Sequence, residues 1–356
     1  MTLEDLLIKT VEHEASDLHI TVGTPPRIRK SGSLLELGEE KLSADKVKEL
    51  IESKMNNLQI QNFNNGSEID YSIGLPGISR FRVNVYSQRG NICAAYRRLP
   101  LDPPELETLG LPDAVINLLD NRKGLILITG ATGSGKSTTM AALVNKLTKE
   151  LSGHILTIED PIEYLYPHSK AQVNQREVGV DTKSFESGLK SALRQDPDVV
   201  VVGELRDPES MAAAMSVAET GHLVFGTMHT NTAAGAITRL VDAFPPEKQD
   251  VIRMNLSMSL LAVVAQQLIP TTDGKRALAA EVLISTQAIR SLIRENNIHQ
   301  IPNYIKSGGK DGMILMDDSL QDLHKKGVIS KDDMLRYAID ASRMEEEGGM
   351  PRQPNL

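Results

Sequence analysis

The stretch "DPDVVVVGELRD", residues 196–207, contains four consecutive valines followed closely by charged side chains. Such a β-branched run is typical of a strand buried on both faces, as in a parallel sheet covered by helices. Glu204 comes two residues after the last valine, at the carboxyl end of the expected strand. Parallel sheets bind their ligands at this end of the strands. The stretch therefore predicts an α/β fold with a functional carboxylate at one sheet edge.

Length and composition restrict the class of protein. The chain has 356 residues, enough for two domains, with 40% apolar and 24% charged residues. Its single cysteine, Cys93, excludes an intrachain disulfide and a zinc site built on cysteines. The formal net charge of -8 argues against a nucleic-acid partner. We expect a cytoplasmic protein without membrane insertion, because we find no signal peptide and no apolar run near the roughly 20 residues that span a bilayer.

The chain divides at a proline-rich linker. Residues 99–112 hold four prolines and no clear hydrophobic period. The preceding residues 1–98 predict a small α/β domain. In it we expect a helix over residues 44–55 and two strands joined by a turn at residues 88–91.

The second half of the chain alternates expected strands and helices. Over residues 113–286 this alternation predicts a parallel sheet with helices on both faces. Short helices are expected over residues 287–343, as a C-terminal helical subdomain. The last residues, 344–356, are expected to be a disordered tail.

A glycine-rich loop, "GATGSGKST" at residues 130–138, fits the pattern G-x-x-x-x-G-K-[ST]. It follows a strand and opens a helix, the context in which this motif cradles phosphates. Glycines allow backbone N–H groups to face an anion, and the helix start adds its dipole. We predict that ATP and Mg²⁺ bind here, with Lys136 on the phosphates and Ser137 on the metal. The expected nucleotide-binding residues are Gly130, Thr132, Gly133, Ser134, Gly135, Lys136, Ser137 and Thr138.

Glu204 is the expected catalytic carboxylate, because it follows a strand that ends at the edge where the loop lies. One strand–helix insertion separates the two motifs, which favours the RecA-like branch of phosphate-loop enzymes. We expect the acidic strand to lie directly beside the loop strand. Glu204 would orient and deprotonate a water that faces the γ-phosphate. The alternative is a solvated acid paired with Arg206.

Two further strands end in polar residues. "ILTIEDPIEY" ends in Glu159 and Asp160, with Glu163 following. Three carboxylates at one edge repel one another unless a cation is near, so we predict that Glu159 and Glu163 join Ser137 around Mg²⁺, partly through water. Glu163 is also expected among the catalytic residues, with an ordinary acidic turn as the alternative. "HLVFGTMHTNT" places His229 at a strand end, where it would sense the γ-phosphate; His222, at the strand start, is a weaker candidate.

Four motifs in order, "GATGSGKSTT", "ILTIEDPIEY", "ALRQDPDVVVVGELRD" and "AETGHLVFGTMHTN", resemble the secretion and type IV pilus ATPases. The opening "EASDLHITVGTPPRIR" is similar to the N-terminal motif of that family. The resemblance implies a PAS-like N-terminal α/β domain, a RecA-like C-terminal ATPase domain and nucleotide held between them. It also implies a homohexameric ring in which domain rotation drives a platform protein of the inner membrane.

The resemblance also gives a role to N-terminal arginines. In the family, arginines of stretches matching "RFRVN" and "YRR" reach the phosphates, and we favour Arg82 and Arg97 as catalytic. Alternation along a strand places Arg80 and Arg82 on the same face. From the residues alone, these arginines are an ordinary solvated face. Arg194 and Arg239 are weaker candidates for contacts between subunits.

The segment "AIRSLIRE", residues 288–295, resembles a motif of the retraction motors in this family, with Ser291 replacing the usual Asn. The resemblance implies ATP-driven retraction of type IV pili, which powers twitching motility, by a cytoplasmic protein docked at the base of the pilus machine. Three alternatives stay open. They are an extension or type II secretion ATPase, which usually carries a longer N-terminus and a tetracysteine zinc element, a RecA-like nucleic-acid translocase, and a nucleotide-dependent scaffold with little turnover.

Overall fold

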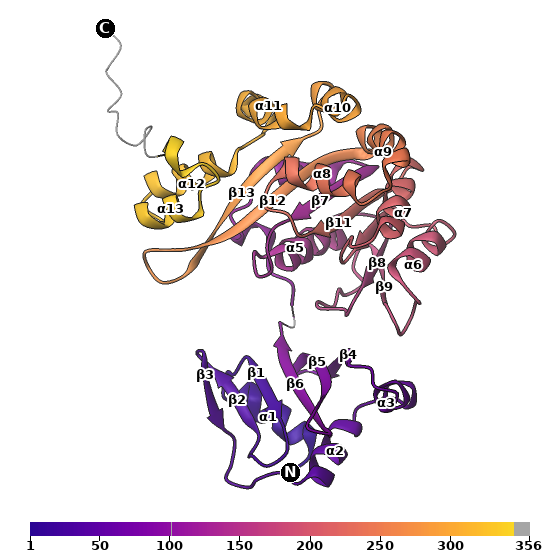
Figure 1. The fold of residues 1–356 in the computed structure, drawn as a ribbon, viewed down its shortest axis with the longest axis vertical. Helices are drawn as coiled ribbons and strands as arrows, with labels where there is room; N and C mark the ends of the chain where they lie inside the picture. The colour runs from indigo at the N-terminus through magenta and orange to yellow at the C-terminus, as the bar shows by residue number, and fades with distance from the viewer. Residues whose placement is uncertain (101, 345–356) are drawn as a thin grey trace. The chain divides into compact units, whose positions relative to one another are not determined.

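The protein forms two compact units in a computed structural model that describes residues 1–100 and 102–344 (Figure 1). The N-terminal unit comprises Met1–Pro103 and Asp160–Leu165, and the C-terminal unit comprises Pro104–Glu159 and Tyr166–Leu356. The expected disordered tail, apart from its first residue, lies outside the described residues. The short segment Asp160–Leu165 is therefore separated in sequence from the rest of its unit.

The N-terminal unit is a six-stranded antiparallel sheet with helices packed on it. Its strand order is β3-β2-β1-β6-β5-β4. The helices bury Leu6, Leu7 and Ile51 against strand residues such as Phe81 and Tyr96. Its helices are α1 (Leu3–Glu12), α2 (Ala44–Glu52) and α3 (Asn57–Asn64), and its strands are β1 (Asp17–Ile20), β2 (Arg27–Lys30), β3 (Ser33–Glu36), β4 (Ile69–Leu75), β5 (Ser79–Gln88) and β6 (Asn91–Leu99).

The expected turn at residues 88–91 joins β5 to β6. Arg89 and Gly90 both have positive φ, at 52° and 76°. Two consecutive left-handed residues are what a two-residue hairpin of type I′ requires, because this turn matches the twist of the strands. The hairpin sets Arg82 directly opposite Arg97 in the β5–β6 pairing.

The C-terminal unit contains a seven-stranded sheet in the order β13-β12-β7-β11-β10-β8-β9. All neighbouring strands are parallel except the antiparallel pair of β12 and β13. The valine strand is buried at every residue, as its sequence predicts, and the α/β fold class is confirmed. The strands are β7 (Gly124–Thr129), β8 (His154–Glu159), β9 (Gln172–Glu177), β10 (Val199–Val202), β11 (Leu223–Met228), β12 (Leu260–Pro270) and β13 (Arg276–Ile284).

One expectation about this sheet is wrong, because the valine strand β10 does not lie beside the loop strand β7. Strand β11 lies between them and pairs with both. It pairs with β7 over six residues, whereas the four-residue β10 pairs on its other edge. The longer, fully buried strand thus takes the central position. As a result His229, which follows β11, extends from the strand between the loop strand and the strand that precedes Glu204.

Helices cover both faces of this sheet. Helices α6, α7, α8 and α9 share one apolar core with one face, while α5 packs in a second core on the other face. The C-terminal helices follow β13 along the chain (Figure 1). The helices are α4 (Asp113–Ile116), α5 (Lys136–Glu150), α6 (Phe185–Ala192), α7 (Pro208–Glu219), α8 (Ala233–Asp242), α9 (Pro246–Ser259), α10 (Gln287–Arg294), α11 (Ile301–Ser307), α12 (Met316–Lys325) and α13 (Lys331–Tyr337).

Within the described part of the chain, no helix is both long enough and apolar enough to cross a bilayer.

Packing of α8 on the sheet is expected to contribute strongly to stability. Leu240 on this helix is fully buried. Leu240→Ala should lower the free energy of unfolding by about 2–5 kcal/mol, because it removes buried methyl groups and leaves a cavity. Urea denaturation followed by circular dichroism measures this loss.

The control is Thr238→Ala, an exposed position on the same helix. It should change the free energy of unfolding by less than about 0.5 kcal/mol. Equal losses at both positions would contradict the packing described for α8.

Candidate functional site

The phosphate loop leaves the carboxyl end of β7 and depends on its glycines. Gly133 and Gly135 have φ of 82° and 90°, in the left-handed region that favours glycine. At Gly130 a side chain is excluded by space, since an added Cβ would lie 2.4 Å from Ser134 Oγ and 2.5 Å from the Gln266 carbonyl oxygen. The loop can therefore adopt the tight curl in which backbone N–H groups converge on an anion.

Helix α5 begins at Lys136 without a side-chain cap, because its N-cap residue is Gly135. Gly135 cannot cap the first turn of this 15-residue helix with a side chain, so the helix dipole at this end can serve a phosphate. The Lys136 ammonium donates to the carbonyl oxygens of Gly130 and Ala131 at 2.8 and 3.0 Å. The ammonium thus lies against the first residues of the loop.

The other predicted loop residues differ in exposure. Thr132 and Ser137 are exposed, and the Ser137 hydroxyl belongs to the first turn of α5. The Ser134 hydroxyl is instead buried, and no hydrogen-bond partner for it is found among the described residues. The Ser134 N–H donates to the Ala131 carbonyl at 3.1 Å, so this residue helps to hold the curl of the loop.

Glu204 is held by two basic side chains. Its Oε2 lies 2.7 Å from Arg206 Nη2, and its Oε1 lies 3.2 Å from His229 Nε2. Burial works against ionisation, but the hydrogen bond and charge of Arg206, with His229, outweigh it and lower the pKa of Glu204. The carboxylate is therefore ionised at neutral pH. Each oxygen keeps a further lone pair that can accept from a water.

Hydrogen bonds between the strand ends fix Glu204 relative to His229. The Leu205 N–H donates to the Thr227 carbonyl at 2.9 Å, and the Thr227 hydroxyl donates to the Gly203 carbonyl. These bonds join the residues around Glu204 to β11, which ends one residue before His229. The geometry of the pair is thus set by the sheet and not by the two side chains alone.

Of the three acids expected at one sheet edge, only Glu159 ends a strand of the C-terminal sheet. Its Oε1 accepts from Thr157 Oγ1 at 2.6 Å and from Gln175 Nε2 at 3.1 Å. Asp160 and Glu163 belong to the N-terminal unit, because the chain leaves the sheet after Glu159.

The side chains near the loop are compatible with Mg²⁺. Among the described residues there is no cluster of three or more His, Cys, Asp or Glu residues that could hold a metal. Mg²⁺ in phosphate-loop proteins needs few protein ligands, because it keeps several waters and binds the phosphates. The exposed Ser137 hydroxyl and the Glu159 and Glu204 carboxylates are oxygen donors of the required kind.

The remaining predicted acid, Glu163, is paired with arginines inside the N-terminal unit. Arg82 Nη1 lies 3.9 Å from Glu163 Oε1, and Arg80 Nη1 donates to the Glu163 carbonyl at 3.3 Å. Both arginines thus contact the same residue, which agrees with the prediction that they share a face of β5. Arg80 is buried and also donates to Ser72 Oγ at 2.8 Å.

Arg97 lies on the neighbouring strand, directly opposite Arg82. Its Nε lies 3.0 Å from Asp17 Oδ1, while its side chain is 72% exposed. Burial opposes ionisation of Asp17, but hydrogen bonds from Ser16 and Arg97 lower the pKa of this carboxyl. The two arginines favoured from the sequence are therefore adjacent on one face of the sheet, and each is held by a carboxylate.

The weaker candidates lie elsewhere. His222 precedes β11, and its carbonyl accepts from the Gly124 N–H at 3.0 Å, at the amino end of the loop strand. It is therefore at the opposite end of the strand from His229. Arg194 and Arg239 are both exposed. Arg239 lines a cavity together with Arg206 and residues of α7 and α8.

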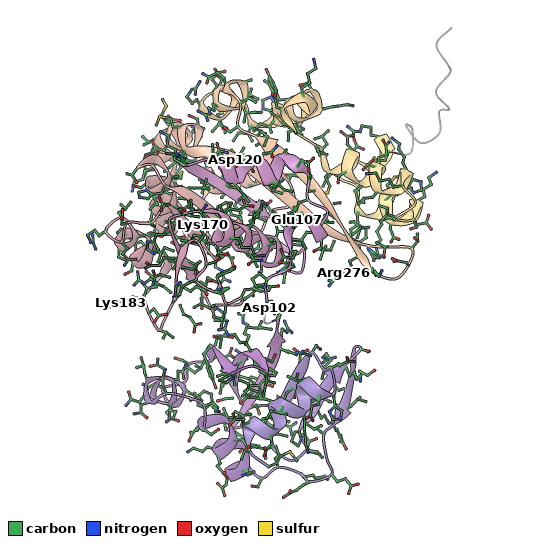
Figure 2. The ribbon with its side chains drawn as sticks, turned by 180° about the vertical axis from the view of Figure 1, so that it is seen from behind. Asp102, Glu107, Asp120, Lys170, Lys183 and Arg276 are labelled. Carbon is green, nitrogen blue, oxygen red and sulfur yellow. The ribbon has the colours of Figure 1, made fainter. Side chains whose placement is uncertain are left out.

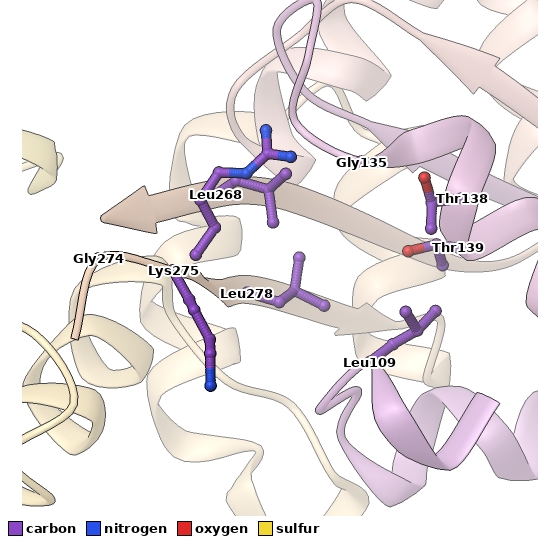
Figure 3. A pocket seen from close by; sticks show the side chains of 9 residues that line it. Leu109, Gly135, Thr138, Thr139, Leu268, Gly274, Lys275 and Leu278 are labelled. Carbon is purple, nitrogen blue, oxygen red and sulfur yellow. The ribbon is translucent and has the colours of Figure 1, made fainter. Parts of the chain in front are cut away.

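A cavity of about 570 Å³ opens beside the start of α5. Figure 3 shows the side chains of Leu268 and Leu278 on the β12–β13 hairpin, across from Thr138 and Thr139 on the helix. Leu109 forms another apolar part of the wall, and Arg276, labelled in Figure 2, begins β13. Apolar walls beside a phosphate loop can hold the base of a nucleotide, and polar side chains can contact its sugar.

The hairpin that lines this cavity was missed in the sequence analysis. Its signal is present in "LLAVVAQQLIPTTDGKRALAAEVLI", residues 260–284, where two apolar runs flank an Asp-Gly dipeptide. Asp-Gly between apolar runs is a strong signal for a hairpin. A search for turn residues after residue 230 would have found it.

Comparison with known proteins shows which of them this chain resembles. "Type IV pilus retractation ATPase PilT" of Pseudomonas aeruginosa is 44% identical over 93% of this chain and 96% of its own length. "Type IV pilus ATPase PilU" of the same organism is 41% identical over 96% of this chain and 90% of its own length.

A solved structure, "Crystal Structure of the Pilus Retraction Motor PilT and Bound ADP", also matches this chain. It superposes with a TM-score of 0.91 at 44% identity, covering 97% of this chain and 99% of that one. A family model described as "Type II/IV secretion system protein" matches residues 2–290. The chain therefore belongs to the Type II/IV secretion system protein family.

Proposed function

We propose that the chain is a motor ATPase that retracts type IV pili and thereby powers twitching motility. The observation that carries the proposal is the meeting of the phosphate loop, His229 and Glu204 at the carboxyl ends of adjacent parallel strands. The name of the Pseudomonas relative, which matches almost end to end, supplies the mechanical task.

ATP is proposed to bind with its phosphates on the loop. The backbone N–H groups of the loop, the first turn of α5 and Lys136 would neutralise the phosphate charge. Ser137 would hold Mg²⁺, with Glu159 and Glu163 contacting its waters. When bound, Mg²⁺ neutralises charge that develops on the transferred phosphoryl group. The cavity lined by Leu109, Leu268 and Leu278 is proposed to take the base and ribose.

Glu204 is proposed as the base that orients and deprotonates the attacking water. It is ionised, and both oxygens have remaining acceptor capacity beside Arg206 and His229. His229 is proposed to report the γ-phosphate, because it touches Glu204 and leads into the loop before α8. Loss of the γ-phosphate would then remove one proposed contact of His229 and alter its other contact, with Glu204.

Arg82 and Arg97 are proposed to supply positive charge to the phosphates during the reaction. Their adjacency on the N-terminal sheet makes them able to act on one anion together. Each would exchange a carboxylate, Glu163 or Asp17, for a phosphate oxygen. For Arg97 this exchange would leave Asp17, whose side chain is only 10% exposed, with the Ser16 hydroxyl as its remaining side-chain donor, so the phosphate contact must offset that loss.

The chain is proposed to work as a homohexamer in the cytoplasm, docked on a platform protein of the inner membrane and acting on the pilus through it. Helix α10 is the proposed docking element. Its apolar residues Ile289, Leu292 and Ile293 are buried in the core of the C-terminal unit. Replacing the whole motif by alanine would therefore disturb folding, and only its polar residues can serve a partner directly.

Glu204→Gln should reduce the kcat of ATP hydrolysis by about 10²- to 10⁴-fold, because an amide cannot take the proton. Binding of a fluorescent ATP analogue should persist in this variant, whereas Lys136→Ala should lose it. The control is Glu209→Gln, an exposed acid five residues further along the chain. Steady-state hydrolysis that survives in Glu204→Gln would remove the proposed base.

Removal of the arginine charges should slow hydrolysis strongly. Arg82→Ala combined with Arg97→Ala is expected to lower kcat by about 10³-fold or more, as loss of an arginine finger does. Arg98→Ala is the matched control, because Arg98 is exposed and next in sequence but on the other face of β6. An unchanged kcat in the double variant would show that the two arginines serve only the N-terminal sheet.

A null strain of the source bacterium should carry excess pili and lose surface movement, whereas bald cells would indicate an extension motor. Complementation with a variant that carries Arg290→Ala and Ser291→Ala on α10 and Glu295→Ala at its C-cap should leave ATP hydrolysis within about twofold and still fail to restore movement. These positions are at least partly exposed, so folding should be kept. If movement returns fully, α10 is not the docking element.

A further inference from the structure

A buried carboxylate, Glu281 on β13, is not used by the proposed mechanism. Its side chain is 5% exposed. In the sheet register, Glu281 lies opposite Ala265, which lies opposite Thr129, the last residue of the loop strand. Glu281 is therefore one strand removed from the base of the phosphate loop.

The two oxygens of Glu281 bind different helices. Oε1 accepts from the Ala233 N–H at 2.7 Å, and Oε2 accepts from the Met316 N–H at 3.4 Å. Ala233 is the first residue of α8, and Met316 is the first residue of α12. A carboxylate is favoured at a helix N-terminus by the dipole and by the free N–H groups.

Both partners are donors, which explains why an acid and not an amide occupies this position. A carboxylate accepts at both oxygens, whereas the nitrogen of a glutamine would face one of the N–H groups with donors of its own. Burial and the nearby Asp317 raise the pKa of Glu281, while the two N–H groups lower it. Two donors therefore partly offset the cost of burying this acid.

One of the two helices leads directly to the reaction site. The four residues before α8 are His229, Thr230, Asn231 and Thr232, and His229 contacts Glu204. Thr232 caps the helix by accepting from the Gly235 N–H at 3.1 Å. Through the Ala233 N–H, Glu281 therefore binds the residue that directly follows residues 229–232, which we call the His229 loop.

The other helix anchors the C-terminal helices. Asp317, next to Met316, accepts from the Ile339 and Asp340 N–H groups at 2.7 and 3.1 Å. The start of α12 and the segment after α13 are therefore joined to each other. A displacement of Met316 would be passed to that segment.

We propose that Glu281 is a positioning residue that holds the His229 loop and links its movement to α12. The inference rests on the proposed function, since the loop moves only if nucleotide binds and is hydrolysed at the site described. Through one carboxylate, the state of the γ-phosphate would reach helices outside the ATPase sheet. Glu281 acts through His229 and touches no substrate.

The test compares hydrogen exchange of the full chain with ADP and with a non-hydrolysable ATP analogue. In the wild type, residues 313–325 should exchange at different rates in the two states. Glu281→Gln should abolish most of this difference, because the amide can accept only one of the two N–H groups. In the same variant kcat should fall by about tenfold with the KM for ATP within twofold, as for loss of a residue that orients another.

Ala233→Pro breaks the link from the other side without changing Glu281. Proline suits the first position of a helix, and Thr232 before it has φ -136° and ψ 155°, the extended conformation that precedes proline. This variant should also lose the difference over residues 313–325. It keeps the proposal testable if Glu281→Gln is poorly folded.

Asp317→Asn is the matched control, since Asp317 is an equally buried acid that accepts two N–H groups but none from the His229 loop. It should raise exchange in both nucleotide states and preserve the difference between them. The proposal is overturned if Asp317→Asn removes the difference as fully as Glu281→Gln, or if both link variants keep it.

The exchange of residues 130–145 separates this inference from the proposed function. If nucleotide fails to protect the loop peptide in the wild type, the proposed function fails and the link fails with it. If the loop peptide is protected while residues 313–325 do not respond, the link alone is wrong.

Discussion

Parallel pairing in register is the constraint on which the rest of the C-terminal unit depends. Strands β7, β11, β10 and β8 run side by side in one direction, so residues far apart in sequence reach the same edge of the sheet. Each face of these strands packs in its own apolar core, so a shift of one residue would disrupt the packing on both faces. The candidate functional site is therefore positioned mainly by apolar packing. The charged side chains at the sheet edge extend from strands whose positions are already fixed by this packing.

The position of β11 between β7 and β10 has a chemical consequence. It places the strand that carries His229 next to the loop strand on one side and next to the Glu204 strand on the other. One histidine can then contact the carboxylate at 3.2 Å while its backbone continues from a partner of the loop strand. If β10 instead lay beside β7, a strand could not pair with both of them, and the residue that follows it would not lie beside both the loop and Glu204. The observed strand order is what brings His229 to Glu204 beside the loop strand.

The sequence was sufficient to find the loop, the buried strand and the acids at strand ends, because each is a local pattern. It was not sufficient to order the strands, since periodicity shows that a strand is buried but not which strand pairs with it. The apolar stripe of α10 was likewise visible in the sequence. Whether that stripe packs in the core or binds a partner depends on tertiary structure, which the sequence pattern does not give. Glu281 had no local signal at all. An acid inside an apolar strand becomes interpretable only when both of its N–H partners are known.

The two carboxylates Glu204 and Glu281 show how surroundings set their chemistry. Both are at least partly buried, but the pKa of Glu204 is lowered because a guanidinium and a histidine outweigh burial, whereas the pKa of Glu281 is raised because burial and Asp317 outweigh its two N–H partners. A low pKa suits an acid that must stay charged beside a phosphate, and a neighbouring cation provides it at the strand end. Glu281, which only connects two helices, needs two acceptor oxygens at the correct positions and not a low pKa.

The segment Asp160–Leu165 extends the same reasoning to the N-terminal unit. It begins directly after Glu159, the last residue of β8, yet it belongs to the N-terminal unit. The chain thus joins the two units at both ends of this segment as well as at the linker. Arg80 holds the segment through the Glu163 carbonyl, and Arg82 contacts the Glu163 carboxylate. Arg82, one of the two arginines proposed to meet the phosphates, therefore contacts a segment that is covalently continuous with the end of β8.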